Sequence, residues 1–192
     1  MNKTSAFRIL IPAVLALASA GLAQASTDDV PRMSNDVYRV SVSFCSNVAA
    51  AEKIECQGDM IASGSRIVAA MGGLPPASAT SIDEGARSKL PEAERNGLAP
   101  VEPGAIDKDD DAAGLAGMVR LCDVYESGPA SRARHHAALK QQAPAAAPRV
   151  EALLADSSTA ARRRVSVGVW QILVLEGPES VARACKQLGA GS

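Results

Sequence analysis

Hydrophobic residues recur at helical spacing along most of this chain. The first stripe follows Asp36 and comprises Val37, Val40, Phe44 and Val48. The alanine-rich segment after this stripe favours a helix. Residues 38–44 also alternate between apolar and polar side chains, which is the period of a half-buried strand. We favour the helix and keep the strand as the alternative.

Later segments repeat the helical pattern. We expect further helices over residues 56–71, 107–127, 131–142 and 149–155 and around Trp170. Gly177 and Pro178 then interrupt the last apolar segment, because neither residue continues a helix well. The chain is therefore expected to end in a C-terminal helical hairpin, whose second helix carries Val181 and Cys185.

The segments between these helices are rich in proline, glycine, serine and alanine. Residues 72–106 predict a long irregular loop, in which a capping box formed by Ser81 and Glu84 can start one short helix. Residues 143–148 predict a linker. Residues 26–35, before the first helix, have the character of a flexible arm.

The first 25 residues have the three parts of a cleavable signal peptide. Lys3 and Arg8 supply the positive start, residues 9–22 are almost wholly apolar, and Ala23-Gln24-Ala25 is a small-residue cleavage site. A membrane anchor needs about 20 apolar residues, and this run is shorter. We therefore predict that residues 1–25 are removed and that no stable membrane anchor remains. The mature protein is expected to be periplasmic or secreted.

Composition narrows the classes of function. Cleavage would remove Lys3 and Arg8 from the 20 basic residues but none of the 21 acidic ones, so the net charge would fall from −1 to −3. This mildly acidic net charge argues against a general affinity for nucleic acid, which requires a clustered basic surface. Residues 36–192 suffice for a single helical domain. With 3% aromatic residues and much alanine, its helices should pack closely.

The four cysteines, Cys45, Cys56, Cys122 and Cys185, are predicted to form two disulfides in an oxidising compartment. The sequence contains no C-x-x-C pair, so a zinc site or a redox-active pair is disfavoured. On one unbroken helix Cys45 and Cys56 would lie about 16 Å apart, so they can pair only across a helix break. We favour Cys45–Cys122 and Cys56–Cys185. The predicted fold is all-α: a small disulfide-stabilised helical domain with a long irregular loop and the C-terminal hairpin.

The acidic run at residues 107–111 is a candidate calcium site, but it lacks two residues that such a site requires. Asp107, Asp109 and Asp111 have the first spacings of a calcium loop, but its required Gly and Glu are replaced by Ala112 and Met118. An acidic run at a helix start is the simpler interpretation. We therefore expect no calcium at this run.

The two histidines, His135 and His136, are adjacent in the sequence. Adjacent residues on a helix point about 100° apart and do not form the i, i+4 metal pair. No motif supplies a nucleophile for either histidine. We therefore predict no catalytic residue, no metal and no cofactor.

One cluster does suggest binding. Arg162, Arg163 and Arg164 lie early in the helix around Trp170, where basic side chains gain nothing from the helix dipole. This placement favours a role in binding a partner.

The region from Asp36 to about Arg134 resembles the periplasmic immunity proteins that neutralise amidase effectors of type VI secretion systems. The shared features are the signal peptide, a cysteine late in the first helix, a small-residue helix and a proline-bearing loop; the segments that carry them are Ser43-Phe44-Cys45, residues 59–64 and residues 118–127. The resemblance covers about half of the chain, and Cys56, Cys185 and the tail beyond Arg134 have no counterpart. It implies an all-helical protein that blocks a cell-wall amidase with a loop.

We therefore expect an exported, non-enzymatic helical protein that binds another protein in the envelope, as an inhibitor or immunity protein. Two alternatives remain. The first is a small envelope hydrolase whose site is assembled from scattered residues, and the second is a structural or accessory envelope protein.

Overall fold

The computed structural model describes residues 25–98, 110–126 and 128–190. Regular structure in these ranges is entirely helical, which confirms the predicted all-α class and excludes the strand alternative for residues 38–44. The predicted signal peptide lies outside the described residues apart from Ala25. Residues 99–106 of the predicted loop lie outside them as well.

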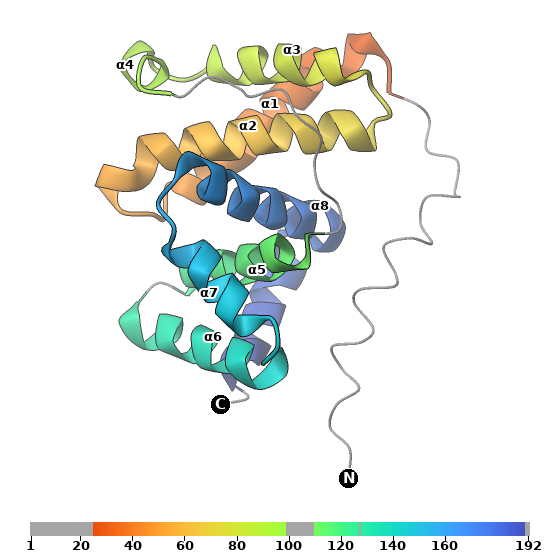
Figure 1. Ribbon diagram of the computed structural model, residues 1–192. Coiled ribbons are helices and arrows are strands. Elements are labelled where there is room, and N and C mark those ends of the chain that lie inside the picture. The colour runs from red at the N-terminus through yellow and green to blue at the C-terminus, as the bar shows by residue number, and fades with distance from the viewer. Residues whose placement is uncertain (1–24, 99–109, 127, 191–192) are drawn as a thin grey trace.

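The first helices form the upper part of the molecule (Figure 1). They are α1 (Val30–Cys45), α2 (Lys53–Met71), α3 (Pro76–Arg87) and α4 (Glu92–Arg95), with short 3-10 turns η3 (Thr27–Asp29) and η4 (Ala50–Glu52). The expectation of a flexible arm over residues 26–35 is wrong, because Ser26 and Asp29 form a capping box and α1 begins at Val30. Much of the segment expected to be irregular is also helical, since it contains α3 and α4.

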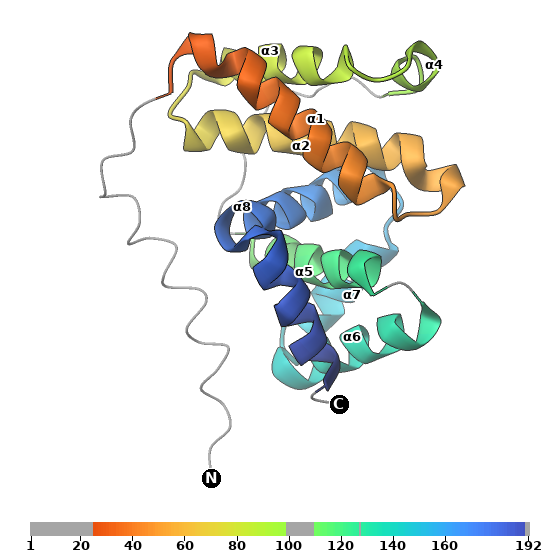
Figure 2. The same ribbon diagram turned by 180° about the vertical axis from the view of Figure 1, so that it is seen from behind.

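The remaining helices build the lower part (Figures 1 and 2). They are α5 (Asp111–Tyr125), α6 (Pro129–Gln142), α7 (Ala147–Ala155) and α8 (Thr159–Ala190). The predicted linker 143–148 is shorter than expected, because α7 already begins at Ala147. The predicted break at Gly177-Pro178 is confirmed: Gly177 has a φ of 70°, and α8 bends there.

Helix α8 joins two hydrophobic clusters. Its first part lies under α2 and contributes Val169 and Trp170 to a core shared with α1, α2 and α3. Val165 of the same helix belongs to a smaller, alanine-rich core with α5 and α7. The α5–α8 contact is very close, because a Cβ added to Gly117 or Gly168 would overlap the backbone of the other helix. Small side chains thus let α8 approach both parts.

The disulfide pairing we favoured is wrong. Cys45 pairs with Cys56, and Cys122 pairs with Cys185, with Cα–Cα distances of 5.8 and 5.2 Å. The first pair becomes possible because α1 ends at Cys45 and the chain turns through η4 before α2. This is the helix break that such a pairing requires. The second pair ties the end of α8, beyond the bend, to α5.

Candidate functional site

A groove of about 550 Å³ lies between α1, α5 and α8. Its apolar lining comprises Val40, Phe44, Val124, Tyr125, Trp170, Leu173 and Val174, and its polar lining comprises Asp36, Arg39, Ser43 and Asn47. The α1 residues in this lining recur at intervals of three or four, so they share one face of that helix. The groove is therefore a product of three helices that are distant in the sequence.

Aromatic residues are concentrated in this groove. The chain contains only two Phe, two Tyr and one Trp, and one of each kind lines it: Phe44, Tyr125 and Trp170. Phe44 and Trp170 are buried, whereas Tyr125 is 46% exposed. Val174 on α8 is 37% exposed. Large side chains that remain accessible beside a buried aromatic floor are typical of protein-binding sites.

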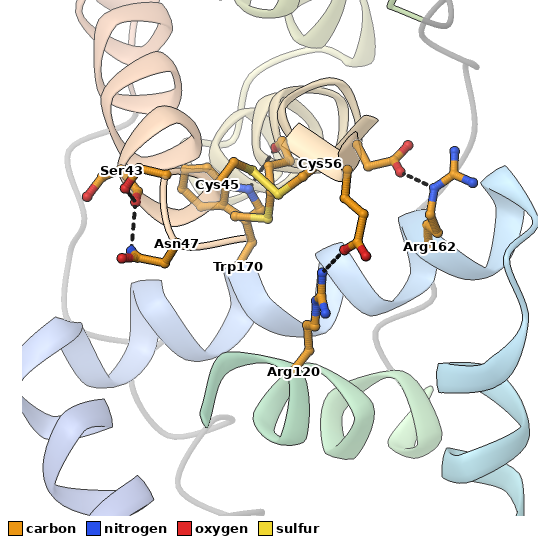
Figure 3. The surroundings of a disulfide bond; sticks show 11 residues. Ser43, Cys45, Asn47, Cys56, Arg120, Arg162 and Trp170 are labelled. Carbon is orange, nitrogen blue, oxygen red and sulfur yellow. Dashed lines mark hydrogen bonds and ion pairs between the residues drawn. A yellow bond between two sulfur atoms is a disulfide. The ribbon is translucent and has the colours of Figure 1, made fainter. Parts of the chain in front are cut away.

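Trp170 is held rigidly in the floor of the groove. Its indole Nε1–H donates a hydrogen bond of 2.7 Å to the backbone oxygen of Met60 on α2. The ring also packs so closely on Gly64 that any larger residue there would overlap it. Figure 3 shows the indole beside the Cys45–Cys56 disulfide, which links α1 to α2 next to Phe44. The floor therefore exists before any partner binds.

The α1 edge of the groove carries exposed polar groups. The Asn47 side-chain amide donates to the backbone oxygen of Ser43 at 3.3 Å, and Ser46 Oγ donates to the same oxygen at 2.7 Å (Figure 3 draws Ser43 and Asn47). Asp36 and Arg39 lie one helical turn apart. Within the described ranges neither of these two side chains forms an ion pair. The edge thus offers two charges of opposite sign that are available to a partner.

The three arginines predicted to bind a partner are engaged within the protein. Arg162 Nε donates to Asp59 Oδ2 at 2.8 Å, and Arg163 Nε lies 3.5 Å from Asp59 Oδ1. Arg164 pairs with Asp110 at 2.8 Å. All three arginines are therefore paired within the chain, and the first two join α8 to α2 (Figure 3 shows Arg162).

Two carboxylates near these arginines are buried. Burial raises the pKa of Asp59 above its usual 3.8, and this effect outweighs the opposing influence of Arg162 and Arg163. Burial likewise raises the pKa of Asp83 on α3, although Arg87 forms a short ion pair with it. Asp59 links α2 to α8, whereas Asp83 pairs within α3, and neither carboxylate lines the groove.

His135 is fully buried between α5 and α6. Its Nδ1 lies 2.8 Å from Asp123 Oδ1, and its Nε2 lies 3.3 Å from Glu126 Oε2. Both ring nitrogens thus contact carboxylates of this chain. Neighbouring His136 is partly exposed and lies 3.7 Å from Glu151. The pair fastens α6 to its neighbours, and His135 has no access to a substrate in this arrangement.

A second hollow, of about 470 Å³, lies beside Arg164. Charged residues line much of it, including Asp110, Arg149 and Asp156. Asp110 is already used twice, since it caps α5 through the backbone N–H of Ala113 and also pairs with Arg164. Of the acidic run 107–111, only Asp110 and Asp111 are described, and they serve the start of α5. Nowhere in the described ranges do three or more His, Cys, Asp or Glu side chains form a possible metal site.

No protein-family model, curated protein or solved structure matches this chain. Among the helices that the structure describes, none combines the length and apolar character needed to cross a membrane. Sequence reasoning missed the groove because its walls come from three separate helices. The one available signal was the scarcity of aromatic residues, which makes the position of each one informative.

Proposed function

We propose that this chain is an exported, non-enzymatic protein that binds another protein of the cell envelope through the groove between α1, α5 and α8. The observation that carries the proposal is the gathering of Phe44, Tyr125 and Trp170 in one groove. Aromatic residues are enriched at the centres of protein interfaces and supply much of the binding energy there.

Export is supported by two independent features, the N-terminal sequence and the disulfides. Residues 1–25 have the layout of a signal peptide, and the four cysteines are paired in two disulfides. Structural disulfides persist in oxidising compartments such as the periplasm or the extracellular space. A protein of this kind meets its partners in the envelope or outside the cell.

An inhibitor or immunity protein against a cell-wall amidase is the finer form of this proposal. It is supported by the resemblance of residues 36–134 to periplasmic immunity proteins of amidase effectors, on the segments named above. A groove with a rigid floor suits an inhibitor, because little conformational entropy is lost when a preformed surface binds. The hydrolase alternative gains no support from His135, whose ring is buried and contacts two carboxylates.

A photo-crosslinking residue in place of Tyr125 tests the proposal in intact cells. We expect it to label one envelope protein, and purified chain to inhibit that protein if it is an amidase. The same crosslinker at Met71, which is 51% exposed at the end of α2 and outside the groove lining, is the matched control. Equal labelling from both positions, or none from either, would count against binding through the groove.

A further inference from the structure

We infer that the groove between α1, α5 and α8 binds an amphipathic α-helix of a partner protein, with an acidic and a basic residue of that helix pairing with Arg39 and Asp36. This inference rests on the proposed function of protein binding and specifies the chemistry of the partner. It follows from the composition of the groove, its length and two charges, Asp36 and Arg39, that form no ion pair with the described residues.

The first step is that the groove can contact a ligand through side chains but not through free backbone groups. Its lining residues belong to α1, α5 and α8 or lie directly after α1, so the backbone groups of these segments are largely used within helices. A peptide that binds as a β-strand gains affinity by adding to a sheet edge. The described ranges contain no strand that could serve as such an edge. A helix satisfies its own backbone and presents an apolar face, which is what this lining can bind.

The second step is that the dimensions fit a short helix. Asp36 on α1 and Asn47, in the turn directly after α1, mark the two ends of the polar edge. Eleven positions at the helical rise of 1.5 Å per residue correspond to about 16 Å. That length is about three helical turns. Three turns present apolar residues at positions i, i+3 or i+4, and i+7 on one face. These anchors would contact the floor formed by Phe44 and Trp170, with Tyr125 and Val174 on the opposite side.

The third step is the charge pattern of the edge. Asp36 and Arg39 are exposed and one turn apart, whereas Ser43 farther along α1 and Asn47 just after it are uncharged. The edge is therefore charged at one end and neutral at the other. A helix with one acidic and one basic residue a turn apart can pair with both charges in only one direction along the groove. Exposed ion pairs contribute little affinity, so their main effect is to select that direction.

A displayed library of amphipathic helices tests the inference directly. Each member has about 14 residues, a fixed leucine stripe, and Glu, Lys or Gln at two flanking positions one turn apart. We expect selection on the disulfide-bonded mature chain to enrich helices with one Glu and one Lys, in either order, because reversing the order reverses the direction of binding. Selection on Asp36→Arg, whose edge carries two positive charges, should enrich Glu at both positions. The same charge preference from both proteins, or no enrichment at all, would overturn the inference.

The chain contains its own reporter of occupancy, because its single tryptophan, Trp170, lines the groove. Synthetic copies of the enriched helix should shift its fluorescence emission. Val174→Glu should weaken binding by at least about tenfold, since it places a charge against the apolar stripe. Leu175→Glu should leave affinity within about twofold, because Leu175 is comparably exposed but lies outside the groove lining. Equal loss in both variants, or in neither, would contradict the inference.

Two further outcomes separate this inference from the proposed function. If the Tyr125 crosslinker labels an envelope protein but no library helix binds, the helical partner is excluded while protein binding stands. If helices bind but no envelope protein is labelled, the groove chemistry stands and the proposed function fails. Sedimentation of the chain over a range of concentrations tests whether a second copy of the chain occupies the groove instead. If the chain self-associates and Val174→Glu abolishes this association, the inference of a helical partner protein is overturned.

Discussion

Helix α8 carries two neighbouring stretches, residues 162–164 and 170–174, that meet their surroundings in opposite ways. In the first stretch all three arginines have carboxylate partners: Asp59 for Arg162 and Arg163, and Asp110 for Arg164. In the second, the buried Trp170 lies in the floor of an open groove, and Val174 remains partly exposed. The run of charges, which stands out in the sequence, is paired with carboxylates of the same chain. The apolar stretch forms the surface that can bind a partner.

The difference shows what a cluster in a sequence can and cannot indicate. Three adjacent arginines can pair with the carboxylates of a partner, but those carboxylates can equally belong to the same chain. A charge becomes available for binding where the fold gives it no partner, and among the described residues Asp36 and Arg39 on the edge of the groove have no ion-pair partner. The variants below test this contrast along α8, from the largest expected effect to the smallest.

Gly168 lies between the two stretches, and its replacement should have the largest effect. A Cβ at this position would overlap the carbonyl oxygen of Ala113, which is backbone and cannot rotate away. We expect Gly168→Ala to lower the free energy of unfolding by about 3 kcal/mol or more. Chemical denaturation measures this loss.

Gly114→Ala on α5 is the matched control, because an added Cβ there meets nothing within 4 Å. It should be neutral or stabilise the protein by up to about 1 kcal/mol. A similar loss in both variants would show that the α5–α8 contact is not as close as described. The roles of the two stretches of α8 would then need revision.

Asp59 supports the first stretch, and its loss should have the next largest effect. Asp59→Ala would leave the buried guanidinium of Arg163 and its neighbour Arg162 without this carboxylate. This carboxylate compensates buried positive charge, while Arg162 keeps a second carboxylate, Glu55, at 3.8 Å, so we expect destabilisation by about 2 kcal/mol. Arg164→Ala is the control within the same run. Its exposed pair with Asp110 should contribute less than about 1 kcal/mol, and a larger loss there would contradict the division between buried and exposed arginines.

Local patterns in the sequence were enough to predict the all-α fold and the bend at Gly177, because each depends on neighbouring residues. They also predicted two disulfides. They could not predict which cysteines pair, since that depends on where α1 ends and how η4 turns the chain. The candidate site was missed for a similar reason. Whether an arginine is free depends on residues a hundred positions away, such as Asp59 for Arg162, and the groove exists only after α1, α5 and α8 have packed.

The pH dependence of stability should show a smaller effect, which arises from the burial of Asp59 beside residues 162–164. Because burial raises the pKa of Asp59 above 3.8, the folded state holds this proton more tightly than the unfolded state does. The contribution of Asp59 to stability is therefore greatest below pH 3.8 and is lost as the pH rises through the raised value. We expect the stability of the wild type relative to Asp59→Asn to fall over this range, as measured by denaturation at a series of pH values.

The comparison with Asp59→Asn is needed because other carboxylates act in the opposite direction. Hydrogen bonds from Ser26 and Lys140 lower the pKa of the partly exposed Asp29 and Glu151, so their contributions are lost as the pH falls. Both groups are the same in the two proteins and cancel in the difference. A difference that stays constant with pH would mean that Asp59 is not desolvated in the way its burial indicates.

The second stretch should show the smallest effect on stability. Val174→Glu and Leu175→Glu both alter partly exposed side chains near the bend of α8, so we expect each to change the free energy of unfolding by no more than about 0.5 kcal/mol. Their effects on binding should differ, because only Val174 lines the groove. A large loss of stability in Val174→Glu alone would show that Val174 belongs to the core. Residues 170–174 would then resemble residues 162–164 in making contacts within the chain, and the contrast along α8 would disappear. Unchanged stability together with impaired binding is the combination that distinguishes a binding surface from a structural one.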